Sequence, residues 1–170
     1  MVLVADDVAI RPARLEDLPQ LIDIDREVRH GPDQPAHAAD WLEPDPVAHL
    51  RGWIAAGECY VAAVGDMLAG YGVLHYHFFH SGIIDLVIVR ASDRRRGIGR
   101  ALVRYLADRC TSEKVWISTN LSNTRMQTLI SSEGFAMCGF IEGLDEGDPE
   151  LVYSKPVKKR PRPARKAGRT

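Results

Sequence analysis

The 170-residue chain has few cysteines and no long hydrophobic run. Cys59, Cys110 and Cys138 are odd in number and widely spaced, which is typical of reduced thiols and argues against a disulfide framework or a zinc site. His75 and His77 share a strand face but lack a third ligand, so we predict no metal. No apolar stretch approaches the roughly 18 residues of a membrane-spanning helix. Because the N-terminus also lacks the basic segment of a signal peptide, we expect a cytoplasmic protein that does not bind membranes.

Acidic residues are absent from residues 155–170, a segment that holds eight lysines and arginines and three prolines. The whole chain has a net charge of −1, so the remainder of the chain is strongly acidic. A basic, proline-rich segment without apolar periodicity is typical of disorder. We therefore predict a folded domain at 1–155 and a disordered basic tail at 156–170. Such a tail either contacts nucleic acid or an acidic partner, or only increases solubility.

Hydrophobic periodicity and turn residues divide the domain into helices and strands. The predicted strands are 8–11, 58–64, 67–79, 83–89, 114–118, 135–141 and 151–154. Gly65-Asp66 is the predicted hairpin turn between 58–64 and 67–79, and Ser81-Gly82 is the predicted turn into 83–89. The predicted helices are 16–29, 46–56, one that begins at 98, and one that runs from a cap at Ser122 or Asn123 to Gly134. Helices between strands predict an α/β layered domain, and the hairpins make its sheet mixed.

A glycine- and arginine-rich loop lies between the apolar strand 83–89 and the helix that follows it. Gly97 and Gly99 remove the side chains that would keep an anion away from the backbone. The helix start offers unpaired N–H groups and the positive end of the helix dipole. The loop therefore predicts a phosphate or diphosphate site. The loop lacks the lysine of a Walker loop. It also lacks the third glycine of a dinucleotide fingerprint, because Leu102 stands at that position. An ordinary glycine-containing turn is the alternative interpretation.

Arg94, Gly97 and Gly99 match the pattern Arg/Gln-x-x-Gly-x-Gly/Ala, which resembles the acetyl-coenzyme A loop of the GNAT superfamily, the general N-acetyltransferases. A second segment is similar to the Asn-x-x-Ala-x-x-Leu-Tyr-x-x-x-Gly-Phe stretch of that family. Its matching residues are Asn123, Leu129, Gly134 and Phe135. The order of elements agrees with this family over nearly the whole domain. The resemblance implies a single GNAT-like α/β domain with a mixed, mostly antiparallel sheet flanked by helices on both faces.

The resemblance also implies acetyl-coenzyme A as co-substrate. Its pantetheine arm would pair with backbone groups of strand 83–89, and its diphosphate would meet the amides and positive side chains of the loop. The implied cofactor-binding residues are Val87, Ile88, Val89, Arg94, Arg95, Arg96, Gly97, Ile98, Gly99, Arg100 and Asn123. Asn123 would reach the pantetheine arm, cap the helix that follows it, or do both.

The implied reaction is direct attack of an amine on the thioester, with a backbone N–H near Val87 stabilising the oxyanion. Two usual catalytic groups are missing, because the usual tyrosine position is Ile130 and the position where some members carry a glutamate is Ser118. Asp85 is the first candidate base, since it would share the strand face of Val87, and a structural acid is its alternative reading. Glu142 is the second candidate. No acid is needed if the coenzyme A thiolate leaves unaided.

The segment 142–150 contains five acidic residues and would form an acidic rim that attracts a cationic amine, unless it is only a solvated turn. The predicted function is therefore an N-acetyltransferase that moves acetyl from acetyl-coenzyme A to a primary amine of a small molecule or a protein. A non-catalytic acyl-coenzyme A sensor and a nucleic-acid-associated protein acting through the tail are the alternatives. The chain would be a monomer or a homodimer.

Overall fold

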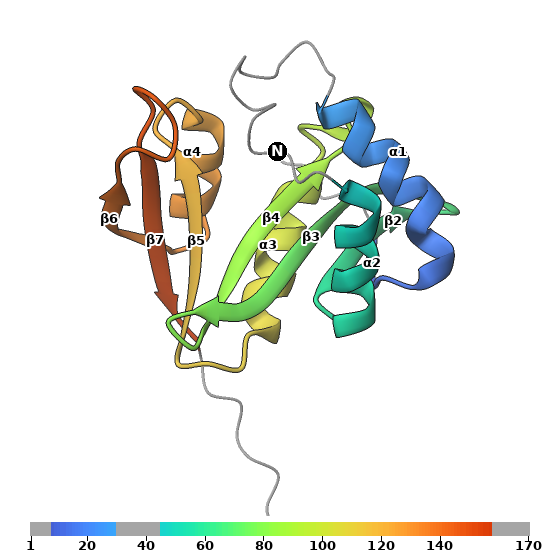
Figure 1. Cartoon of the computed structure of the whole chain (residues 1–170), viewed down its shortest axis with the longest axis horizontal. Coiled ribbons are helices and arrows are strands. Elements are labelled where there is room, and N and C mark those ends of the chain that lie inside the picture. Colours follow the sequence, from blue (N-terminus) through green and yellow to red (C-terminus); the bar gives the residue numbers. More distant parts are fainter. Residues whose placement is uncertain (1–7, 30–44, 158–170) are drawn as a thin grey trace, which may run out of the picture.

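The computed structural model describes residues 8–29 and 45–157. Within these residues, strands and helices follow one another in the order β, α, α, β, β, β, α, β, α, β, β, as predicted (Figure 1). The strands are β1 (Val8–Pro12), β2 (Cys59–Val64), β3 (Met67–Phe78), β4 (Ser81–Val89), β5 (Lys114–Asn120), β6 (Ala136–Ile141) and β7 (Glu150–Pro156). The helices are α1 (Leu18–Arg29), α2 (Pro46–Ala56), α3 (Ile98–Arg109) and α4 (Thr124–Ser132).

The strands form one sheet in the order β1-β2-β3-β4-β5-β7-β6, in which only β4 and β5 are parallel. Helices α1 and α2 cover one face, where Leu21, Ile24 and Leu50 pack against Val73 of β3. Helices α3 and α4 cover the other face. Each fully buried aliphatic side chain in these layers stabilises the fold by about 1.5–3 kcal/mol. The predicted α/β fold, with a mostly antiparallel sheet between two helical layers, is confirmed.

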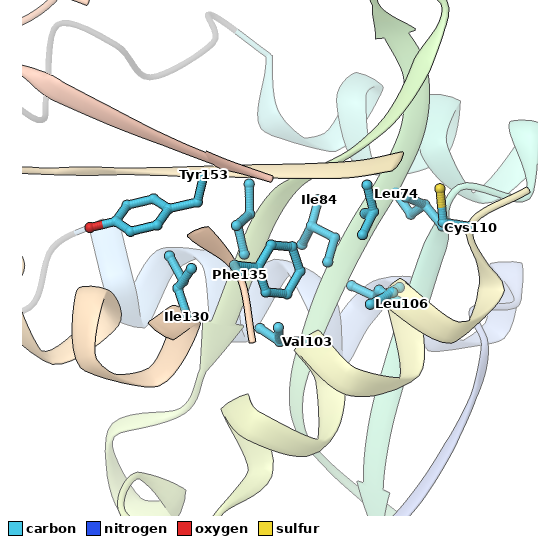
Figure 2. Packing of buried hydrophobic residues seen from close by; sticks show 11 residues of the cluster. Leu74, Ile84, Val103, Leu106, Cys110, Ile130, Phe135 and Tyr153 are labelled. Carbon is cyan, nitrogen blue, oxygen red and sulfur yellow. The ribbon is translucent and has the colours of Figure 1, made fainter. Parts of the chain in front are cut away.

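The core beneath α3 and α4 joins the two halves of the sheet. Val103 and Leu106 of α3 meet Ile130 of α4 in one cluster (Figure 2). Tyr153 of β7 and Phe135, which directly precedes β6, belong to the same cluster. Ile130 is completely buried there. Helix α4 is therefore held against β5 and β7 by apolar packing, and its Leu129 lies near Gly99 at the start of α3.

The turn between β3 and β4 differs from the prediction. Phe79 and His80 form it, with φ of 48° and 57°, although the sequence places glycine at 82 and not here. Gly82 lies inside β4. A side chain is excluded at this position, because a Cβ atom would clash with Cys110 Sγ. The glycine therefore serves close packing against the end of α3, and the prediction that it forms the turn is wrong.

Helix α1 begins two residues later than predicted. A 3₁₀ turn, Leu15–Asp17, precedes it. The Asp17 carboxylate accepts a hydrogen bond of 2.7 Å from the Arg14 N–H and two bonds, of 2.7 and 2.8 Å, from the Arg11 guanidinium. These bonds hold the entry to α1 in a tight turn, and the Arg11 hydrogen bond lowers the pKa of the Asp17 carboxyl.

Strand β7 continues to Pro156, so the folded part of the chain reaches the predicted start of the basic tail. The Val157 N–H donates a hydrogen bond of 2.9 Å to the Glu113 carbonyl. The rest of the predicted tail, 158–170, lies outside the described residues. Within 8–29 and 45–157, no helix is long and apolar enough to cross a membrane.

Candidate active site

Strands β4 and β5 pair at one end and then separate. Their paired residues are Gly82 with Val115, Ile83 with Trp116, and Ile84 with Ile117. Beyond these pairs, residues 86–89 of β4 remain paired to β3 on one edge but have no partner strand toward β5 (Figure 1). Backbone polar groups on that edge are open to a ligand that carries amides of its own.

A β-bulge marks the point of separation. Leu74 of β3 stands opposite Ile84, and the next register pair is Val73 with Leu86, so Asp85 is the extra residue on β4. A bulge changes which face each following side chain occupies. The Asp85 carboxylate is thereby aimed differently from an acid in a regular strand.

The bulge corrects the expectation that Asp85 and Val87 share a face of the sheet. Val87 packs toward α3, whereas Asp85 Oδ2 lies 3.3 Å from His75 Nε2. His75 directly follows a β3 residue of the α3 face and therefore occupies the opposite face, on the side of α1 and α2. Asp85 is about half exposed and His75 is mostly buried, so the carboxylate lies at the rim of the separated strands.

The loop before α3 has the backbone of an anion cradle. Arg95 has φ of 62°, which is unusual for a residue with a side chain, and Gly97 has φ of 82°. Left-handed residues alternating with right-handed or extended ones turn successive N–H groups to one side. A Cβ atom added at Gly97 would meet nothing within 4 Å, so the space above this residue is open.

The arginines of this loop are used differently from one another. The Arg94 Nε donates a hydrogen bond of 3.3 Å to the Val89 carbonyl, and Arg96 is paired with Asp93. Arg100 Nη1 lies 3.7 Å from Glu133. Arg95 has no hydrogen bond or ion pair within the described residues. The positive side chains that the sequence assigns to a diphosphate are thus partly engaged within the protein.

Helix α4 lies beside the start of α3. A Cβ atom at Gly99 would stand 3.6 Å from both Leu129 of α4 and Val89 of β4, which are ordinary contact distances. Asn123 caps α4, since its side chain accepts a hydrogen bond of 3.1 Å from the Met126 N–H. The capping role predicted for Asn123 is present, and the residue is exposed at the α4 side of the separated strands.

Two acids of the loop between β6 and β7 accept hydrogen bonds from the end of β5 and the residues that follow it. Buried Asp148 accepts hydrogen bonds of 2.8 and 2.6 Å from the Ser122 N–H and hydroxyl. Asp145 accepts a hydrogen bond from the Asn120 amide. Glu142 is exposed and has no hydrogen bond or ion pair with another described residue. Glu142 follows Ile141 of β6, and strands β5 and β7 lie between β6 and Asp85 of β4.

Glu150 carries a carboxyl group that the sequence analysis had not singled out as a candidate base. Glu150, the first residue of β7, lies near Ser118 of β5, whose side chain acts to lower the pKa of the Glu150 carboxyl. Burial raises the pKa of the Glu150 carboxyl above its usual value, and the carboxylates of Asp145, Asp148 and Asp85 raise it further, against the opposing effect of Ser118. Glu150 is thus a half-buried acid whose pKa is affected by both Ser118 and Asp85.

The sequence matches the family model of the acetyltransferase (GNAT) family over residues 19–135. The chain belongs to this family. A comparison with curated proteins finds no match. The predicted family is confirmed, and the protein is a GNAT acyltransferase.

Solved structures of GNAT proteins resemble the chain along its length. An acetyltransferase of the GNAT family from Bacillus cereus is 26% identical, with a TM-score of 0.76 over 89% of this chain and 99% of that one. The putative acetyltransferase yncA from Salmonella typhimurium, solved with its cofactor acetyl-CoA, is 18% identical, with a TM-score of 0.72 over 92% and 97%. Ribosomal-protein-alanine N-acetyltransferase from Brucella melitensis is 22% identical, with a TM-score of 0.73 over 88% and 99%.

Ile130 and Ser118 stand at the two positions where the family resemblance implies a tyrosine and, in some members, a glutamate. Ile130 is completely buried in the core, so no proton donor stands where the family often has a tyrosine. Ser118 lies diagonally opposite Glu150 on the neighbouring strand β7. No group of three or more His, Cys, Asp or Glu side chains in residues 8–29 and 45–157 is arranged to hold a metal ion.

Proposed function

We propose that this GNAT protein moves the acetyl group of acetyl-coenzyme A to a cationic primary amine by direct attack in a ternary complex. The observation that carries the proposal is the separation of β4 from β5 after Ile84 and Ile117, directly beside the open, left-handed loop at the start of α3. A ligand with a diphosphate at one end and an amide-containing arm at the other matches this combination.

The proposed cofactor position runs along β4. The diphosphate would lie over the amides of residues 95–100, at the positive end of α3. The pantetheine arm would then follow the unpaired edge of Val89, Ile88 and Val87 toward the closed end of the gap. Because Gly97 and Gly99 project no side chain into this space, the arm and the diphosphate would meet backbone directly.

In the proposed reaction, the amine nitrogen attacks the thioester carbon, the C–N bond forms, and the C–S bond breaks. The N–H of Val87 would stabilise the charge on the carbonyl oxygen, and loss of such a donor typically reduces kcat by about 100-fold or more. The coenzyme A thiolate would leave without a protein acid, since Ile130 replaces the usual tyrosine. The acceptor amine is positively charged near pH 7 and therefore must lose a proton before it can attack.

The cationic nature of the acceptor follows from the charges around the rim. Asp85 approaches the rim from β4 and Glu150 approaches it from β7. Carboxylates in this position attract an ammonium group and repel an anionic competitor. A lysine side chain, a polyamine and a chain N-terminus share this chemistry, and both small molecules and proteins can supply it.

A thiol-release assay with a panel of primary amines tests the proposal. Wild-type protein and acetyl-coenzyme A should release free coenzyme A only with an amine present, and mass spectrometry should find the acetylated amine. Initial rates at several concentrations of both substrates should give intersecting reciprocal plots, as a ternary complex requires. Acetyl-enzyme formed without an amine would contradict direct attack. A protein that binds acetyl-coenzyme A tightly but releases no thiol with any amine would be the sensor that buried Ile130 favours.

A further inference from the structure

Glu150 lies where the sheet opens. It stands opposite Asn120 in the β5–β7 ladder, and Ser118 stands opposite Val152, two residues farther along β7. Ser118 and Glu150 are therefore diagonal neighbours on one face of adjacent strands, which places the Ser118 side chain near the Glu150 carboxyl. Leu151 and Tyr153 point to the other face, into the core beneath α4.

Ser118 is the first residue of β5 beyond the last pair with β4, which is Ile84 with Ile117. Asp85 is the corresponding first residue of β4. The two residues thus flank the closed end of the gap, and Glu150 is close enough to Asp85 for the charge of one to affect the other. In the proposed cofactor position, the arm enters from the loop before α3, so its thioester end lies toward this closed end.

We propose that Glu150, beside Ser118, is the group that accepts the proton of the acceptor ammonium. This inference rests on the proposed function and adds the base that the sequence could not identify. The ammonium transfers one proton to the Glu150 carboxylate and becomes a neutral amine. After attack on the thioester, the second nitrogen proton reaches the departing thiolate, giving coenzyme A thiol. Glu150 then returns its proton to water, so the reaction releases one proton in total.

The surroundings of Glu150 suit this task better than those of the other acids. Asp85 is half exposed and already contacts His75, and Glu142 is exposed at the end of β6, which β7 separates from β5. Glu150 is half-buried, which raises the pKa of its carboxyl toward the working range of a general base. The groups that act on its charge are Ser118 of β5, Asp85 of β4, and Asp145 and Asp148 of the β6–β7 loop. Asp85, on the other flank, would hold the ammonium in place.

The test is the pH dependence of kcat for Glu150→Gln, because glutamine keeps an acceptor for the Ser118 hydroxyl but cannot take a proton. We expect kcat at neutral pH to fall by about 100-fold or more. The loss should shrink with an amine whose own pKa lies below the assay pH, since this substrate needs no base for its first proton. Acetyl-coenzyme A affinity, measured by titration calorimetry, should remain within about twofold and shows that the variant is folded.

Two variants that leave Glu150 in place should move the acid limb of the kcat profile in opposite directions. Ser118→Ala removes the hydroxyl that lowers the pKa, so the limb should shift to higher pH. Asp145→Asn removes a repelling charge, so the limb should shift to lower pH. Glu146→Gln removes an exposed charge from the same loop and should leave the midpoint where it is.

The outcomes separate the two proposals. Wild-type protein that releases no thiol with any amine would end the proposed function itself. An active wild type with an unchanged kcat and acid limb in Glu150→Gln would overturn only the role of Glu150. If Asp85→Asn, and not Glu150→Gln, abolished the acid limb, Asp85 would be the base and Glu150 a structural residue.

Discussion

Gly97→Ala isolates the proposed contact between backbone and diphosphate. A methyl group at this position meets no protein atom within 4 Å, so it enters only the space that the diphosphate would occupy. If it displaces one oxygen from the amides of the loop, a charge-assisted hydrogen bond worth about 1.5–3 kcal/mol is lost. Since 1.4 kcal/mol corresponds to about tenfold in affinity, the Kd for acetyl-coenzyme A should rise by about 10- to 100-fold.

The same substitution also strains the backbone, and this effect must be separated from binding. A residue with a Cβ atom in the left-handed region costs about 1–2 kcal/mol, and the reduced freedom of the unfolded chain offsets about half of that. The net loss of stability at Gly97 should therefore be about 1 kcal/mol. For a chain of this length, the melting temperature should fall by about 2–4 °C.

Gly57→Ala is the matched control. Gly57 follows α2, on the opposite side of the sheet from α3, has φ of 72°, and likewise has nothing within 4 Å of an added Cβ atom. Both variants should therefore lose similar stability in thermal unfolding. Only Gly97→Ala should lose affinity for acetyl-coenzyme A in titration calorimetry. Equal affinity in the two variants would refute the proposed diphosphate position.

Three further predictions concern stability. The folded-state pKa of Glu150 is raised, so its ionised form destabilises the native protein at high pH. Glu150→Gln should therefore have a higher melting temperature than wild type at pH 8, and the difference should disappear near pH 4. A lower melting temperature of the variant at pH 8 would contradict the raised pKa. Asp17→Asn should cost about 2 kcal/mol at pH 7 in denaturant unfolding, because it weakens the paired bonds from Arg11. The pKa of Asp17 is lowered, so this cost should decline as the pH falls below about 4, and a pH-independent cost would show that the ion pair is not its source. Gly82→Ala should destabilise the protein by about 1–3 kcal/mol in the same assay, since its methyl group meets Cys110 Sγ, and a neutral effect would mean that the packing there can relax.

Local signals in the sequence were sufficient for most of the fold. Pro46 and Gly57 mark the two ends of α2, and the Gly65-Asp66 pair joins β2 to β3 as predicted. These features depend on neighbours along the chain, so propensity and turn chemistry identify them. The loop glycines and the Asn123 cap belong to the same class, which is why the sequence could predict both features.

The acceptor side depends on contacts between strands that are distant in sequence. The bulge at Asp85 follows from the register of β3 against β4, and the position of Glu150 beside Ser118 follows from the register of β5 against β7. Periodicity within one strand contains neither register. The acid at the start of a strand, after an acidic loop, was the only local signal for Glu150. The turn at Phe79 and His80 was missed because both residues adopt backbone angles that favour glycine.

Amide hydrogen exchange with and without acetyl-coenzyme A tests the central claim most directly. If the cofactor occupies the gap between β4 and β5, exchange should slow in peptides that cover residues 85–89 and 95–100. Peptides from β2, which lies on the far side of β3, should exchange at an unchanged rate. Protection confined to other segments, or binding without protection of 85–89 and 95–100, would contradict the account.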